Sequence, residues 1–137
     1  VIPKWTASMI NNEEVFVNGD GETSRDFCFI ENVVQMNILA SVAVKEAKNN
    51  VFNAAVGDRT TLNTLYGSIQ KSLNTNGVES ILQPTYRDFR VGDVRHSQAN
   101  IGKAKDLLGF EPQFKIQDGI DKAMPWYIEF LNGNKIS

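Results

Sequence analysis

Two short segments of the sequence combine arginine, aspartate and glycine in a way that suits binding of a phosphorylated ligand. They are residues 18–27 and 90–97, in which Arg25 and Arg90 each stand beside a flexible turn. A planar guanidinium can contact two oxygens of a diphosphate at once, and glycine lets backbone N–H groups approach an anion. The segments therefore predict a diphosphate-bearing ligand. The alternative is that Arg25 forms a surface ion pair with Asp26 or another carboxylate, an interaction worth ~0–1 kcal/mol and without function.

Other chemistries are less well supported by the residues present. The Gly19-x-Gly21 turn is not a dinucleotide-binding loop, because Ser24 stands where a third glycine is required. The sequence has no Gly-Lys-Ser/Thr element, which excludes the phosphate loop of NTPases. His96 could act as a general base or as a hydrogen-bond donor in a loop. Together with the one cysteine, Cys28, this one histidine cannot assemble a zinc site, and Cys28 is predicted to lie unreactive in a buried strand.

The composition is that of an ordinary folded domain. Of 137 residues, 42% are hydrophobic and 22% are charged. The formal net charge of -2 provides no general attraction to nucleic acid or to an anionic membrane. No stretch approaches the roughly 20 apolar residues that span a bilayer, and one cysteine suits a reducing compartment, so we expect a cytoplasmic protein. The start at Val1 rather than Met predicts that the chain begins inside a larger protein.

The apolar spacing predicts helices separated by a few short strands. The helices are expected at residues 3–10, 32–47, 61–73, 101–108 and 118–131, and the strands at 15–17, 27–30 and 51–56. Thr61 and Asn100 are predicted N-caps, and Gly109 a C-cap. The helix at 32–47 is apolar on most sides, which predicts that it is well buried, and residues 86–97 are predicted to be a charged loop. So few strands indicate part of a larger α/β protein.

The order of several motifs resembles a known family, the extended short-chain dehydrogenases/reductases, which are NAD-dependent nucleotide-sugar epimerases and dehydratases. Within that family the sequence is most similar to UDP-N-acetylglucosamine 4-epimerases of bacterial surface-polysaccharide pathways, including the Vi polysaccharide biosynthesis type. The likeness rests on Gly19-Asp20-Gly21-x-x-x-Arg25-Asp26-Phe27-x-Phe29-Ile30-x-Asn32-Val33, on Asn53, on Arg90-x-Gly92-Asp93-Val94-Arg95-His96-Ser97, and on Lys103-Ala104-x-x-Leu107-Leu108-Gly109-Phe110-x-Pro112.

The resemblance covers only the C-terminal portion of the family. It implies an α/β fold in which residues 1–137 form the UDP-sugar-binding domain of a longer enzyme, with the Rossmann half absent. The Gly-x-x-Gly-x-x-Gly turn that binds NAD in the family is missing, and so is its catalytic Tyr-x-x-x-Lys pair. The tyrosines are followed four positions later by other residues: Tyr66 by Gln70, Tyr86 by Arg90 and Tyr127 by Leu131. No catalytic residue is therefore predicted here, and NAD is expected to bind to the missing N-terminal half.

Carried over by position, the resemblance implies roles for the charged residues already singled out. Arg25 and Arg90 would hold the diphosphate of UDP. Asp93 would accept a hydrogen bond from a ribose hydroxyl. These roles agree with the chemistry predicted from the residue types alone.

The resemblance also implies which residues surround the base and the sugar. The strand at 15–18 would line the uracil, with Asn18 at the position where relatives often place an aromatic stacking residue. Phe16, two residues earlier and on the same face of the strand, is a candidate substitute. Ser97 stands beside the C2 substituent of the sugar, where a small side chain fits an N-acetyl group; alternatively it only satisfies a backbone group of its loop.

The function that these similarities imply is isomerisation of UDP-N-acetylhexosamines at C4 for surface polysaccharide synthesis. The complete enzyme would oxidise the C4 hydroxyl to a ketone, let the sugar rotate while UDP stays anchored, and return hydride to the other face. This chain would supply the anchor, and the full-length enzyme would be a homodimer. The alternatives are a fragment of a nucleotide-sugar 4,6-dehydratase or of a uronate epimerase, and a binding module without catalysis.

Overall fold

The computed structural model describes residues 1–133, which fold as two compact units. The first unit consists of residues 1–23 and 61–95 and of the chain from Ile120 onward. The second consists of residues 24–60 and 96–119. Each unit is assembled from segments that are distant in the sequence, so its core depends on long-range contacts.

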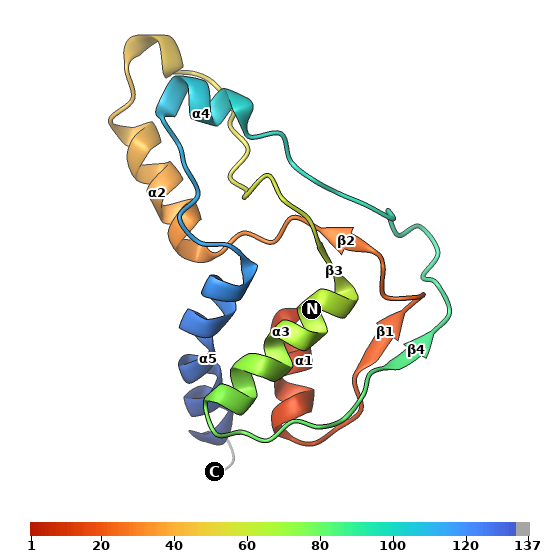
Figure 1. Ribbon diagram of the computed structural model, residues 1–137. Helices are drawn as coiled ribbons and strands as arrows, with labels where there is room; N and C mark the ends of the chain where they lie inside the picture. The colour runs from red at the N-terminus through yellow and green to blue at the C-terminus, as the bar shows by residue number, and fades with distance from the viewer. Residues whose placement is uncertain (134–137) are drawn as a thin grey trace. The chain divides into compact units, whose positions relative to one another are not determined.

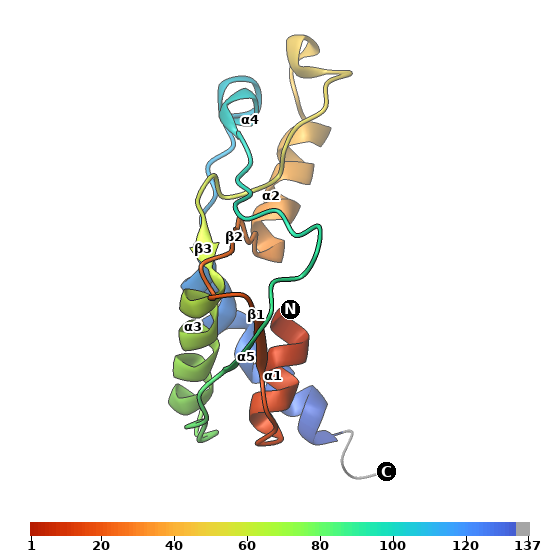
Figure 2. The same cartoon turned by 90° about the vertical axis from the view of Figure 1, so that its right-hand side faces the viewer.

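Two helices that lie side by side form the base of the first unit. These are α1 (Ile2–Ile10) and α3 (Leu62–Thr75), seen as neighbours in Figure 2. A third helix, α5 (Ile116–Gly133), begins in the second unit and continues into the first. The buried apolar side chains of the first unit come from all three helices, from β1 and from Val15, which directly precedes β1. They are Trp5, Met9, Val15, Val17, Leu65, Tyr66, Ile69, Leu73, Ile120 and Met124.

The first unit also contains a short parallel sheet. Strand β1 (Phe16–Asn18) pairs with β4 (Thr85–Arg87), with Phe16 opposite Thr85 and Asn18 opposite Arg87 (Figure 1). The N–H of Gly19 donates to the carbonyl of Arg87 at 2.8 Å and extends the pairing by one residue. Because parallel strands end at the same edge of a sheet, the segments that follow Asn18 and Arg87 leave that edge together.

The second unit is built around a small apolar cluster between helices. Helix α2 (Ile30–Ser41), the 3-10 turn η1 (Lys45–Ala47) and α4 (Gly102–Leu108) surround it. The cluster consists of Met36, Ala104 and Phe110, with Leu39, Phe52, Ala54 and Leu108 packed against it. Strand β2 (Ser24–Arg25) is paired with β3 (Thr60–Thr61) in a second two-stranded sheet.

Within residues 1–133, no helix has both the length and the apolar character needed to cross a membrane.

The predicted α/β fold with few short strands is confirmed, as are several predicted helix ends. Thr61 caps α3, and its hydroxyl oxygen accepts a hydrogen bond from the N–H of Thr64 at 3.1 Å. Gly109 ends α4 in the left-handed conformation, with φ of 64°. The N-cap of α4 is Ile101 rather than Asn100, although the side-chain oxygen of Asn100 still accepts from the N–H of Gly102 at 2.8 Å.

The helix predicted at 32–47 is shorter and more exposed than expected. Helix α2 ends at Ser41, whose hydroxyl donates to the carbonyl of Ile38 at 2.7 Å and so offers the backbone an alternative to a further helical turn. Burial on most sides was also a wrong prediction. Ile30, Val34 and Ile38 are 62%, 48% and 59% exposed, and they share one face because they are four residues apart.

The strands predicted at 27–30 and 51–56 are wrong. No strand is assigned to either segment, because in the described part of the chain neither meets a backbone neighbour with which to form a ladder. Instead the N–H groups of Val56 and Gly57 donate to the carboxylate of Asp26, each at 3.0 Å.

Cys28 is half-buried in an irregular segment rather than in a core strand. Burial raises the pKa of its thiol, which keeps it protonated at neutral pH and agrees with the predicted lack of reactivity.

Candidate functional site

A loop of the first unit, residues 88–94, carries two of the predicted ligand-binding residues. Every residue of this loop is exposed to solvent. It contains one internal turn, in which the N–H of Asp93 donates to the carbonyl of Arg90 at 3.2 Å, and Gly92 has a positive φ of 84°. Within residues 1–133 the side chains of Arg90 and Asp93 form no hydrogen bond or ion pair. Both charges are therefore available to a ligand.

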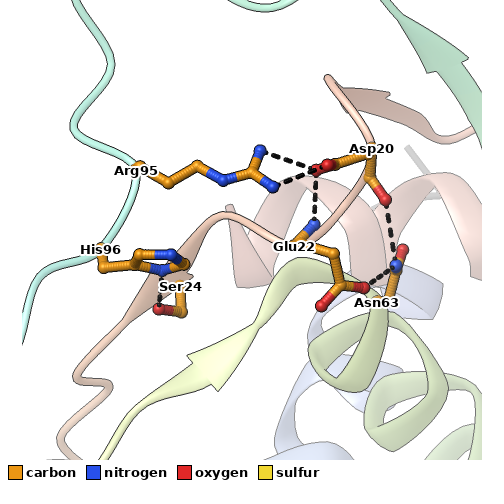
Figure 3. A network of polar contacts seen from close by, with 6 residues as sticks. All are labelled: Asp20, Glu22, Ser24, Asn63, Arg95 and His96. Carbon is orange, nitrogen blue, oxygen red and sulfur yellow. Dashed lines mark hydrogen bonds and ion pairs between the residues drawn. The ribbon is translucent and has the colours of Figure 1, made fainter.

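Both ends of the loop are attached to the glycine-rich turn at residues 19–22, which follows β1. The loop starts directly after β4, which pairs with β1, and it ends at Arg95. The guanidinium of Arg95 donates two parallel hydrogen bonds to the carboxylate of Asp20, at 2.8 Å and 2.6 Å (Figure 3). The Asp20 carboxylate also accepts from the N–H of Glu22 at 2.9 Å. The bonds from Arg95 and then from Glu22 lower the pKa of Asp20, so the ion pair is charged at neutral pH.

Asn63, in the first turn of α3, holds the glycine-rich turn in place. Its backbone N–H donates to the carbonyl of Gly21 at 3.0 Å, and its side-chain amide donates to the carbonyl of Asp20 and to the carboxylate of Glu22, at 3.1 and 2.7 Å. The hydroxyl of Tyr86 donates to the Asn63 side-chain oxygen at 2.9 Å. One network thus joins α3, β4 and the turn, as Figure 3 shows for Asn63, Asp20 and Glu22.

The two glycines of this turn make room for protein side chains. Gly19 and Gly21 have positive φ angles of 74° and 77°. A Cβ atom added to Gly19 would collide with the ring of Phe89, and one added to Gly21 would collide with the side chain of Asn63. The two glycines therefore allow Phe89 and Asn63 to pack closely against the turn.

We expect Gly21→Ala to destabilise the protein more than Gly77→Ala. Gly77 also has a positive φ, of 79°, but a Cβ atom added there meets nothing within 4 Å. The Gly77 variant therefore loses only the about 1–2 kcal/mol of the left-handed conformation. The Gly21 variant must also displace Asn63, which we expect to cost about 1–3 kcal/mol more. Urea unfolding measures the difference, and equal losses would show that the Asn63 network does not stabilise the turn.

On β1, the two residues predicted to lie near a base have different surroundings. Phe16 is half-buried, and the guanidinium carbon of Arg87 lies 3.1 Å from the centre of its ring. This cation–π contact covers one face of the ring. Asn18 is exposed at the end of the strand and is paired in register with Arg87.

In the second unit, Arg25 and Ser97 meet at one carbonyl group. The Arg25 guanidinium donates to the carbonyl of Ser24 at 2.8 Å, and the N–H of Ser97 donates to the same oxygen at 3.1 Å. In the described part of the chain Arg25 forms no ion pair with Asp26 or another carboxylate. His96 is hydrogen-bonded through Nδ1 to the hydroxyl of the buried Ser24 at 2.9 Å (Figure 3).

The structure therefore divides the predicted site residues between the units. Phe16, Asn18, Arg90 and Asp93 lie in the first unit, and Arg25 and Ser97 lie in the second. Three residues that contact the first group or hold its segments in place, namely Arg87, Arg95 and Asn63, were not predicted from the sequence. Of these three, only Arg95 could have been singled out from the sequence. It lies in the second motif, and the first motif contains Asp20, an acidic residue that could pair with it. Residues 1–133 contain no group of three His, Cys, Asp or Glu side chains that could hold a metal ion.

Comparison with known proteins finds one family model that covers most of the chain. The model, described as GDP-mannose 4,6 dehydratase, matches residues 1–123. The structure is similar to that of UDP-glucose 4-epimerase from Thermotoga maritima with UDP-glucose, with a TM-score of 0.82 and 33% identity over 95% of this chain and 40% of that one. It is also similar to UDP-N-acetylglucosamine 4-epimerase from Methanobrevibacter ruminantium in complex with UDP-N-acetylmuramic acid, with a TM-score of 0.80 and 32% identity over 95% of this chain and 39% of that one.

A third solved structure is similar in fold. It is a UDP-glucuronic acid 4-epimerase from Bacillus cereus in complex with a fluorinated UDP-glucuronic acid and NAD, with a TM-score of 0.79 and 22% identity over 95% of this chain and 40% of that one. The chain spans 38% to 41% of the length of the first curated relatives that it matches. The matched part is the C-terminal portion of these proteins.

Proposed function

Because the chain belongs to the GDP-mannose 4,6 dehydratase family, within the extended short-chain dehydrogenases/reductases, we propose that it is the substrate-binding part of an NAD-dependent UDP-N-acetylhexosamine 4-epimerase. In this proposal its task is to hold UDP while the sugar reacts. Binding energy from a remote, unreactive part of a substrate positions the reacting carbon, and small displacements there are costly in rate. The reaction would serve surface polysaccharide synthesis in the cytoplasm.

The observation that carries the proposal is the tethered loop with two unpartnered charges. A diphosphate needs a cation that no carboxylate of the protein already neutralises, and Arg90 meets that condition. Asp93, three residues later in the same loop, is an acceptor for a ribose hydroxyl. Arg25 is the proposed second ligand of the diphosphate, and it too forms no ion pair within residues 1–133.

The residues that we propose for the base and the sugar are uncharged, unlike those that we propose for the diphosphate and the ribose. Asn18, exposed at the end of β1, and Phe16, with one ring face covered by Arg87, would line the uracil. Ser97 would leave space for the acetamido group at C2 of the sugar, because its side chain is small. The relative from Methanobrevibacter ruminantium, which is a UDP-N-acetylglucosamine 4-epimerase, supports this choice of sugar.

We further propose that this portion belongs to a longer enzyme, whose remaining part binds NAD. We do not place NAD at the glycine-rich turn, because the side chains of Phe89 and Asn63 lie beside its two glycines. The exposed apolar face of α2, formed by Ile30, Val34 and Ile38, would be covered by the remaining part of the family fold. The match to only about two fifths of the length of the relatives supports this. We also propose that the longer enzyme is a homodimer.

A related activity is the second candidate. The family model is described as a 4,6-dehydratase, and one similar structure is a UDP-glucuronic acid 4-epimerase. Both activities require the same nucleoside diphosphate anchor, so Arg25, Arg90 and Asp93 would keep their roles. The identity of the sugar, and therefore Ser97, separates these candidates from the preferred one.

Titration calorimetry on the whole protein that contains this chain tests the choice of sugar. We expect UDP-N-acetylglucosamine to bind more tightly than UDP-glucose or dTDP-glucose. Ser97→Tyr should weaken binding of the N-acetylated sugar nucleotide about tenfold, while affinity for UDP alone stays the same. Equal affinity for all three sugar nucleotides would remove the acetamido assignment, and absence of UDP binding would remove the proposed function.

A further inference from the structure

The ion pair between Asp20 and Arg95 has a geometry that folding stability does not explain. Its two parallel hydrogen bonds fix the guanidinium in the plane of the carboxylate. The side chains are nevertheless 48% and 43% exposed, and exposed ion pairs contribute little to stability. This pair joins the glycine-rich turn, through Asp20, to the end of the exposed loop, through Arg95.

The segment that the pair restrains is the loop at 88–94. The ladder between β1 and β4 holds the start of the loop, and Arg95 holds its end, so both ends are attached to the turn that follows Asn18. The ring of Phe89 lies beside Gly19, and its centre is 5.2 Å from the Arg95 guanidinium carbon. Between these attachments the loop is exposed and carries the unpartnered side chains of Arg90 and Asp93.

Asp20 is itself held in place by hydrogen bonds from other residues. Its backbone carbonyl accepts from Asn63, and its carboxylate accepts from the N–H of Glu22 as well as from Arg95. Asn63 belongs to α3, which supplies buried side chains to the core of the first unit. The end of the loop is therefore attached, through one ion pair, to a turn that is attached to a packed helix.

We propose that Asp20 and Arg95 are positioning residues for a nucleoside diphosphate, whose ion pair fixes the end of the loop and so the orientation of Arg90 and Asp93. This inference rests on the proposed function and adds two residues to it. Without the pair, the loop samples more conformations. Binding must then order it, and this cost reduces affinity but does not change the reacting atoms.

Asp20→Asn tests the inference with little disturbance of the turn. The amide oxygen of Asn can still accept from the N–H of Glu22, whereas the charge facing Arg95 is lost. In the whole protein that contains this chain we expect about tenfold weaker UDP binding, a similar rise in KM for UDP-N-acetylglucosamine, and an unchanged kcat. The thermal midpoint should not change. The control is Glu111→Gln, which breaks the exposed pair with Lys105 in the second unit and should alter none of these quantities.

A double-mutant cycle with Arg90→Ala distinguishes the possible failures. If the pair acts through Arg90, then Asp20→Asn weakens UDP binding much less in the Arg90→Ala background than in the wild type. If Arg90→Ala weakens binding and Asp20→Asn does not, the positioning role is wrong and the proposed function stands. A fall in thermal midpoint with additive effects on affinity would also overturn the inference. If Arg90→Ala has no effect on UDP affinity, the positioning role and the proposed function are both wrong.

Discussion

Arg90→Ala should weaken UDP binding about 10- to 100-fold, which is the effect of removing a hydrogen-bonded charge from a diphosphate. Arg90 is exposed and has no partner within residues 1–133, so its removal breaks no contact of the described structure. We therefore expect the free energy of unfolding to stay the same. Calorimetric titration with UDP measures the affinity, and urea unfolding checks that the variant is folded.

Arg59→Ala is the matched control for this experiment. Arg59 is also exposed, its guanidinium forms no ion pair in the described part of the chain, and it lies in the second unit outside both motifs. Both variants change the net charge by the same amount. Equal losses of affinity would mean that UDP responds to net charge only, which would contradict a specific role for Arg90.

The largest effect on stability is expected for Asn32→Leu. Asn32 is 1% exposed, and its side-chain amide donates to the carbonyl of Phe114 at 2.8 Å. Its side-chain oxygen accepts from the N–H groups of Gln113 and Phe114, at 2.8 and 3.1 Å. Leucine has a similar size but leaves these backbone groups without their partner. We expect the free energy of unfolding to fall by about 3–4 kcal/mol, measured in urea.

Asn37→Leu provides the control on the same helix. Asn37 is exposed on α2, so the same change of side chain there should alter stability by no more than about 0.5 kcal/mol. The comparison removes the effect of leucine on helix formation, because both sites lie within α2. Similar losses at the two sites would show that the buried amide of Asn32 does not hold segment 113–114 to the helix.

Elements with strong local signals were predictable from the sequence. Thr61 as an N-cap and Gly109 as a C-cap defined the ends of their helices, because capping depends on residues close in sequence. The prediction of a strand at 51–56 was wrong because a run of apolar residues indicates only that burial is favourable. Whether it becomes a strand depends on a backbone partner, and the described chain provides none.

The residue types of the candidate site could be proposed from the sequence, but the contacts that hold these residues could not. The motifs and the chemistry of arginine pointed to Arg25, Arg90 and Asp93. That Arg95 pairs with Asp20 could not be inferred, because it depends on β4, a strand of three residues within a segment predicted to be a loop. Such a short strand has no apolar period of its own, and its pairing with β1 is a long-range contact.

We propose that Arg90 and Arg25 each contact the diphosphate of UDP. The most direct measurement is a crystal structure of the whole protein that contains this chain, with UDP bound. We expect both guanidinium groups at about 3 Å from oxygens of the diphosphate, and Asp93 at a ribose hydroxyl. A UDP molecule whose diphosphate is held by other residues, with either arginine pointing away from it, would contradict the claim.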